Sequence, residues 1–227
     1  QNLLEVTRDT EKLVREAQAE VDKAKETLTV KAQALKKVRV AAAPKLCDAV
    51  TKQMSHLQMG SAQIELNFED LPFEQWNKVG STKIELMYKP SAQMTARPLR
   101  KIASGGEVSR VMLACKVVLG ESDVCDTLVF DEVDAGVGGA TAVALAEVLA
   151  QLAKTHQVIV VTHLPQVAVM ASKQYVVSKT EEHNALPVTS LTEVSGTQRE
   201  EEIARMLSGS ITEASLAHAH ELLSEVR

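Results

Sequence analysis

The first 43 residues contain no Gly or Pro, and apolar side chains recur among them at heptad spacing. This repeat predicts a long helix with one apolar seam, as in one strand of a coiled coil. Lys31 interrupts the seam and several seam positions are only Ala, so the helix needs a partner for stability. A lone amphipathic helix lying on a globular body is the alternative. Pro44 marks the expected kink or end of the helix. The seam consists of Val14, Val21, Leu28, Leu35 and Ala42, with Ala17, Ala24 and Val38 offset by three.

The period of the pattern changes to two over residues 63–68 and again over residues 83–88. Strict alternation of polar and apolar positions predicts two half-exposed antiparallel strands. Residues 90–101 read as a polar loop. The Ser-Gly-Gly sequence at 104–106 then opens an apolar helix that runs through Leu119.

Strands and helices alternate in the second half of the chain. Short apolar strands at 127–130 and 158–161 flank a helix at 140–153. Uninterrupted Val and Ile runs on either side of a helix indicate parallel strands with both faces covered. The predicted fold class is therefore α/β. Segments 174–179 and 189–194 are expected to continue the sheet as an edge hairpin, and two helices, at 198–207 and 212–226, close the chain.

Composition and charge narrow the function classes. A net charge of −5 and a pI near 5.7 argue against a broad basic surface for nucleic acid. Residues 1–40 carry nine Lys and Arg against seven Asp and Glu, so the remainder is the acidic part and any DNA contact is local.

Cys47, Cys115 and Cys125 form no Cys-x-x-Cys pair, so neither a disulfide framework nor a zinc site is indicated. This cysteine usage fits a reducing, cytosolic compartment. No apolar run reaches membrane-spanning length, and no signal peptide opens the chain. Because Gln1 is not an initiator methionine, we expect a fragment or a processed chain.

An acidic pair, Asp131-Glu132, ends the first apolar strand. Ligands of open α/β sheets bind beyond the carboxyl ends of the strands, so these carboxylates point to where a nucleotide would lie. One acid can hold Mg²⁺ through water, and its neighbour can orient and deprotonate an attacking water. A strand-terminal Asp-Glu is more often a solvated edge or a helix cap, so the pair by itself is a weak signal.

Two further segments could face the same place. Ser104, Gly105, Gly106 and Glu107 begin a helix, where free N–H groups and a hydroxyl can bind a phosphate, although the same residues also read as a capping box. His163 follows the second apolar strand and could contact a γ-phosphate, or be an ordinary hydrogen-bonded residue. All three segments fall at ends that one parallel sheet would bring together, and this common position favours a nucleotide site.

Together these residues resemble a known family. Residues 104–110 (SGGEVSR) are similar to the signature motif of ATP-binding-cassette (ABC) ATPases in its SMC form, and residues 127–139 to Walker B with the following D-loop. Residues 161–168 resemble the switch-histidine loop. The glycine-rich D-loop, the His-Leu-Pro-Gln phrase and the ending at 202–209 and 217–223 resemble the RecN family of SMC-like DNA repair ATPases, from about Leu99 to the end.

The resemblance implies a role for each matching residue. Asp131 would help to hold Mg²⁺ through water, Glu132 would polarise the lytic water, and His163 would sense the γ-phosphate. The signature residues would contact ATP held by a second, identical head, and the D-loop would run across that interface. The signature set is Ser104, Gly105, Gly106 and Glu107, and the D-loop set is Asp134, Ala135 and Gly136. Many SMC heads have an acid where this chain has Gly138, so a D-loop carboxylate role is not carried over to that position.

The phosphate-cradling loop is missing, because no G-x-x-x-x-G-K-[ST] sequence occurs anywhere in the chain. In the family this Walker A loop lies in the N-terminal half of the head, so the chain alone should bind ATP poorly. We expect residues 1–56 to be the returning coiled-coil helix and residues 57–227 the C-terminal lobe of the head. The resemblance implies a bacterial cytoplasmic protein that associates with the nucleoid and not with a membrane. This protein would hold DNA during double-strand-break repair and recombination. The alternatives are an SMC-type chromosome tether and an ABC transporter subunit, although Glu107 and the heptad arm count against a transporter.

Overall fold

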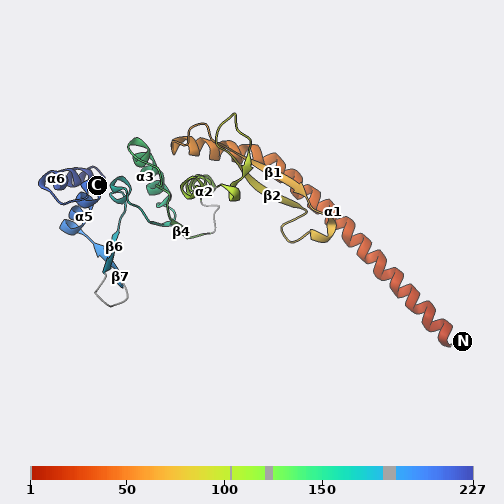
Figure 1. Ribbon diagram of the computed structural model, residues 1–227. Helices are drawn as coiled ribbons and strands as arrows, with labels where there is room; N and C mark the ends of the chain where they lie inside the picture. The colour runs from red at the N-terminus through yellow and green to blue at the C-terminus, as the bar shows by residue number, and fades with distance from the viewer. Residues whose placement is uncertain (1, 103, 121–124, 181–187, 227) are drawn as a thin grey trace. The chain divides into compact units, whose positions relative to one another are not determined.

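The computed structural model describes residues 2–102, 104–120, 125–180 and 188–226 (Figure 1). These residues form two compact units. One unit combines the chain up to residue 48 with residues 64–87, and the other combines residues 49–63 with the chain from residue 88 onward. The expected division of the sequence at residue 56 stays a prediction.

The N-terminal helix α1 runs from Asn2 to His56 and contains Pro44. The expectation that the helix ends at Pro44 is therefore wrong. A proline in a helix removes one backbone hydrogen bond and crowds the preceding turn. Three alanines, the best helix formers, precede Pro44. Beyond it Val50 and Met54 are fully buried, and this packing continues the helix.

The apolar seam of α1 is exposed along the arm. Val14, Val21 and Leu28 keep 62%, 45% and 47% of their surface accessible. Nearer the strands, Lys36 pairs with Asp70 at 2.6 Å, within the same unit. The long helix is thus confirmed, and its pairing with a second helix stays a prediction.

Strands β1 (Gln63–Asp70) and β2 (Thr82–Lys89) confirm the two segments of period two. They belong to a three-stranded sheet in the order β1-β2-β3. The expected polar loop at 90–101 contains the short strand β3 (Arg97–Pro98) and a 3-10 turn, η2 (Leu99–Lys101). A second 3-10 turn, η1 (Phe73–Gln75), connects β1 to β2.

The predicted alternation of strands and helices is confirmed. Its members are α2 (Gly105–Leu119), β4 (Thr127–Phe130), α3 (Ala140–Leu152), β5 (Gln157–Val160) and α4 (Pro165–Ala168). Strands β4 and β5 are parallel, with Thr127 opposite Gln157 and Phe130 opposite Val160. Their carboxyl ends therefore lie side by side.

Among the residues that the structure describes, only one face of the β4–β5 sheet is covered. Leu128 and Phe130 are buried, whereas Val129, Ile159 and Val161 are 65%, 46% and 58% exposed. The prediction that both faces are covered is thus wrong for this chain. Alternate side chains of a strand point to opposite faces, and the described residues pack on one of these faces only.

Strands β6 (Gln174–Thr180) and β7 (Val188–Val194) form an antiparallel pair, which confirms the hairpin. The expected continuation of the β4–β5 sheet is wrong, because within the described ranges the hairpin is a separate two-stranded sheet. Helices α5 (Gly196–Ser208) and α6 (Glu213–Glu225) follow and confirm the two closing helices. Their core contains the buried residues Ala168, Val169, Ile203, Ala204 and Ala219.

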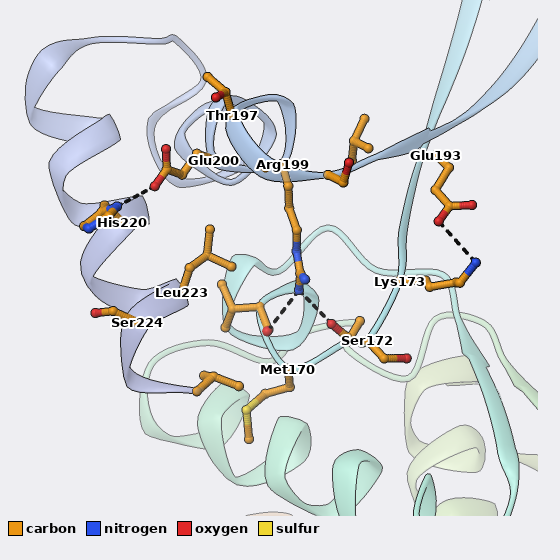
Figure 2. A pocket seen from close by; sticks show the side chains of 16 residues that line it. Met170, Ser172, Lys173, Glu193, Thr197, Arg199, Glu200, His220, Leu223 and Ser224 are labelled. Carbon is orange, nitrogen blue, oxygen red and sulfur yellow. Dashed lines mark hydrogen bonds and ion pairs between the residues drawn. The ribbon is translucent and has the colours of Figure 1, made fainter.

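A hollow of about 560 Å³ lies between the base of the hairpin and helices α5 and α6 (Figure 2). Arg199 donates to the carbonyl oxygens of Ala168, Val169 and Ala171 and so joins α5 to the end of α4. The other charges at its wall pair with each other, Lys173 with Glu193 and Glu200 with His220.

None of the helices in the described part of the chain is both long and apolar enough to cross a membrane.

Candidate functional site

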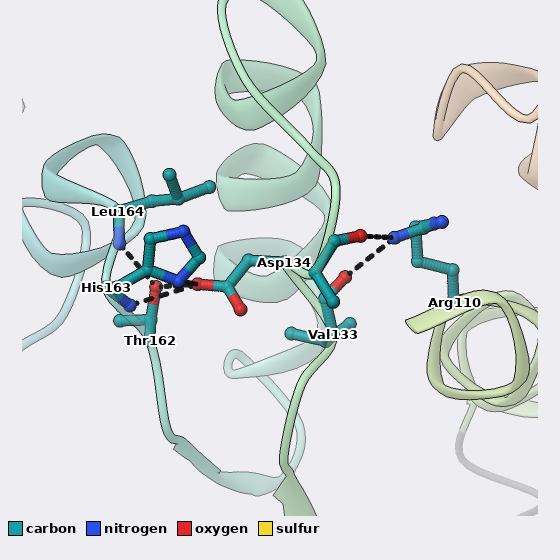
Figure 3. A network of polar contacts seen from close by, with 7 residues as sticks. Arg110, Val133, Asp134, Thr162, His163 and Leu164 are labelled. Atoms are coloured by element: carbon teal, nitrogen blue, oxygen red, sulfur yellow. Dashed lines mark hydrogen bonds and ion pairs between the residues drawn. The ribbon is translucent and has the colours of Figure 1, made fainter. Parts of the chain in front are cut away.

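The three predicted segments meet at one end of the β4–β5 sheet. Asp131 and Glu132 follow β4 directly, and His163 lies three residues after β5. Because the strands are parallel, both loops leave the same edge. The start of α2 contacts the first loop, and Asp134 joins the first loop to the second (Figure 3).

Helix α2 begins with only the Ser104 half of the expected capping box. Ser104 is the N-cap residue, and its hydroxyl accepts the N–H of Glu107 at 3.3 Å. The Glu107 carboxylate accepts a hydrogen bond at 3.3 Å from the hydroxyl of Tyr88, which is buried. Burial, followed by the negative charge of Glu107, raises the pKa of Tyr88 to about 12. A protonated tyrosine of β2 thus holds the carboxylate of Glu107, the acidic residue of the signature segment.

Two glycines bring α2 very close to the loop after β4. A Cβ atom at Gly105 would lie 2.5 Å from Oε2 of Glu132. At Gly106 it would lie 2.9 Å from Cβ of Ala135 and 3.0 Å from its carbonyl oxygen. Glycine is therefore required at Gly106, where the backbone of Ala135 is in the way, whereas the exposed Glu132 side chain could move aside for a side chain at Gly105.

Two side chains on the same face of α2 bind the backbone of this loop. The Ser109 hydroxyl donates to the carbonyl oxygen of Asp131 at 3.0 Å. Arg110 Nη1 donates to the carbonyl oxygens of Val133 at 3.3 Å and Ala135 at 2.9 Å (Figure 3). The sequence analysis missed both residues. Their spacing of four from Gly105 and Gly106 places them on the glycine face of the helix and could have indicated them.

Asp134 connects the two strand-end loops. Its side chain is 3% exposed, and one carboxylate oxygen accepts hydrogen bonds from the Thr162 hydroxyl at 2.5 Å and the His163 N–H at 3.1 Å. Nδ1 of His163 lies 3.2 Å from the same oxygen. The Asp134 side chain therefore binds the second loop of its own chain, and the expected place of Asp134 at an interface between heads stays a prediction. That Ala135 and Gly136 lie at such an interface stays a prediction, and both residues are exposed.

The groups that could perform chemistry remain open to solvent. Asp131 and Glu132 are exposed, and 71% of the His163 side chain is accessible. Within the described ranges no three His, Cys, Asp or Glu residues are grouped to bind a metal ion directly. Asp131 thus offers one carboxylate, which fits a hydrated Mg²⁺ held partly by other groups, such as substrate phosphates.

Comparisons with known proteins agree with the resemblance seen in the motifs. No family model matches the chain. The chain is 40% identical over 220 residues to the DNA repair protein RecN of Streptomyces coelicolor. The aligned residues cover 92% of this chain and 38% of that protein. It is 42% identical over 207 residues to RecN of Deinococcus radiodurans, which covers 91% of this chain and 36% of that protein. The chain thus spans less than two fifths of these relatives and resembles RecN over nearly all of its own length.

Solved structures identify the fold. The Smc head domain of Pyrococcus yayanosii, with a coiled coil and joint, matches with a TM-score of 0.57 at 19% identity over 90% of this chain and 36% of that one. The Smc head domain of Pyrococcus furiosus, with an extended coiled coil and bound to the C-terminal domain of ScpA, matches with a TM-score of 0.53 at 20% identity. This match covers 99% of this chain and 47% of that one. The fold is that of an SMC-type head lobe with a coiled-coil arm.

Replacing Asp134 by Asn should destabilise the chain. The amide lacks the negative charge that strengthens both hydrogen bonds and places an NH2 group in a buried site, so we expect a loss of about 1–3 kcal/mol in the free energy of unfolding. Urea denaturation of the purified chain measures this loss. Asp131→Asn is the matched control, because this carboxylate is exposed and should change stability by less than about 0.5 kcal/mol. Equal effects of the two substitutions would contradict the proposed packing.

Tyr88 should make stability depend on pH in the alkaline range. Its folded pKa, about 12, exceeds the model-compound value of 10.0, so its contribution is complete below about pH 10 and is lost as the pH rises towards 12. Tyr88→Phe should therefore show a shallower fall in unfolding free energy between pH 10 and 12 than the wild type. Tyr175→Phe, at an exposed tyrosine, serves as control. Indistinguishable slopes for the wild type and Tyr88→Phe would disprove the assignment.

Proposed function

We propose that this RecN-like chain is the C-terminal lobe of an ABC-type ATPase head in a protein of DNA double-strand-break repair and recombination. One observation carries the proposal. The acidic pair after β4, the histidine after β5 and the glycine start of α2 meet at one sheet edge, connected by Arg110 and Asp134. These are the positions from which a phosphoryl-transfer site can be assembled.

Each exposed group has a task in ATP hydrolysis. Asp131 would hold Mg²⁺ through water, and the metal, when bound, would neutralise charge on the phosphates. The Glu132 carboxylate would accept a proton from the water that attacks the γ-phosphate. His163 would donate a hydrogen bond to that phosphate, with its backbone N–H held by Asp134. All three groups act from short loops anchored on a parallel sheet.

The site is completed by parts outside this chain. We assign the exposed apolar face of the β4–β5 sheet, made by Val129, Ile159 and Val161, to the lobe that carries Walker A. Two observations support this assignment. The sequence contains no Walker A motif, and the chain spans only 36–38% of its RecN relatives. Removing the three side chains from water would favour the association.

The signature residues would serve a second head. Gly105 is exposed at the start of α2, where free N–H groups favour an anion. In a dimer of heads, Ser104, Gly106 and Glu107 would cap ATP bound to the opposite copy, and the D-loop would lie between the copies. The exposed seam of α1 would pair with the outgoing arm of the same protein. DNA would bind locally or to other segments, in the cytoplasm at the nucleoid, because the chain is acidic.

A chromosome-tethering head of SMC type is the second candidate, and the likeness to Smc head structures favours it. There slow hydrolysis would gate a DNA clamp. A zinc hook, a hinge domain or a kleisin-binding surface in the full-length protein would support this alternative.

Glu132→Gln in the full-length protein should lower kcat for ATP by at least about 100-fold, because an amide cannot accept the proton. ATP-dependent association of heads should persist, since the amide keeps the size of the side chain. Steady-state turnover with and without linear duplex DNA measures the first effect, and size-exclusion chromatography measures the second. Glu147→Gln, at an exposed position on α3, is the matched control. Unchanged turnover in Glu132→Gln would refute the assignment of the base.

A further inference from the structure

Glu132 has an unusual backbone conformation. Its φ angle is +56°, and among the described non-glycine residues it shares a positive φ only with Gln58. In this region the Cβ of an L-residue crowds the backbone, so the conformation persists only where the surroundings impose it. Glu132 is exposed, so burial of its side chain does not impose the conformation.

Hydrogen bonds from α2 enclose Glu132 on both sides. Before it, the carbonyl oxygen of Asp131 accepts from the Ser109 hydroxyl at 3.0 Å. After it, the carbonyl oxygens of Val133 and Ala135 accept from Arg110 Nη1 at 3.3 Å and 2.9 Å. Every polar side-chain contact described above between α2 and this loop thus goes to the backbone immediately around the strained residue.

The turn that contains Glu132 has one backbone hydrogen bond of its own at this residue, from the Ala135 N–H to the Glu132 carbonyl oxygen at 3.0 Å. The two glycines add the close approach that brings Ser109 and Arg110 within reach of the loop. The same face of α2 therefore carries the glycines that allow the close approach and the two side chains that donate the hydrogen bonds.

We propose that Arg110, together with Ser109, is a positioning residue that holds Glu132 in its left-handed conformation and so places the Glu132 carboxylate. The inference rests on the proposed function, in which that carboxylate accepts a proton from water. It adds that the position of the base depends on α2, the helix that starts with the signature. A shift of α2 on its ligand in the opposite head would carry Glu132 with it.

Kinetics of the full-length protein test the proposal. Arg110→Met keeps the length of the side chain but removes its donors, and should lower kcat for ATP at least tenfold with little change in KM. Arg110→Lys, which keeps one charged donor, should recover part of the loss. Arg205→Met is the matched control, since Arg205 is an exposed arginine on α5 paired with Glu202. A wild-type kcat in Arg110→Met would overturn the proposal.

A double-mutant cycle separates positioning from a general loss of structure. If Arg110 acts through Glu132, adding Arg110→Met to Glu132→Gln should not lower single-turnover hydrolysis further. A second loss as large as in the wild type would show that Arg110 acts elsewhere and would overturn the inference. If Arg110→Met does not fold, Ser109→Ala provides the same cycle with a smaller first effect.

Stability gives a readout that needs no ATPase activity. Glycine adopts a φ of +56° without strain, so Glu132→Gly should raise the urea midpoint of this chain. Arg110→Met should then shift the midpoint more in the Glu132→Gly background than in the wild type, because a Glu132 loop freed from Arg110 relaxes and recovers its strain, whereas the glycine variant has no strain to recover. Equal Arg110→Met shifts in both backgrounds would overturn the inference. Absence of ATP turnover in the wild-type full-length protein would instead overturn the proposed function, and the stability cycle would still decide the role of Arg110.

Discussion

The close packing of the first turns of α2 on the loop after β4 is the constraint on which the candidate site depends. A side chain at Gly106 would collide with Cβ and the carbonyl oxygen of Ala135, so this contact requires glycine, whereas a side chain at Gly105 would meet only the movable carboxylate of Glu132. At this separation Ser109 and Arg110 reach three backbone carbonyls of the loop. The signature start and the acidic pair are therefore parts of one packed element, although some 25 residues separate them in the chain.

Asp134 extends this element to the second loop. A buried carboxylate costs much free energy unless donors satisfy it, and Thr162 and His163 supply those donors. The backbone of His163 is thereby positioned while its ring stays exposed. Structural polar groups are buried and paired, whereas the groups proposed for chemistry remain accessible to a nucleotide. This separation is expected of a site whose remaining parts come from another lobe and another copy of the head.

Much of the fold was predictable from sequence pattern. The heptad repeat indicated α1, alternation indicated β1 and β2, and apolar runs indicated the parallel strands β4 and β5. What failed depends on tertiary context. Pro44 does not end α1, because the burial of Val50 and Met54 outweighs one lost hydrogen bond. Apolar runs also could not reveal that Val129 and Ile159 lie exposed, since an apolar strand has the same pattern whether one of its faces or both are covered. The motifs located the chemical residues, but Ser109, Arg110 and the inward direction of Asp134 required the geometry.

The central claim is that this chain holds one part of a divided nucleotide site, organised before its partners arrive. Isothermal titration calorimetry with Mg-ATP tests it most directly, on the chain alone and on the chain co-purified with the N-terminal part of the same protein. The account predicts no measurable binding by the chain alone and saturable binding by the reconstituted pair. Tight binding by the chain alone, or none by a stable pair, would contradict it.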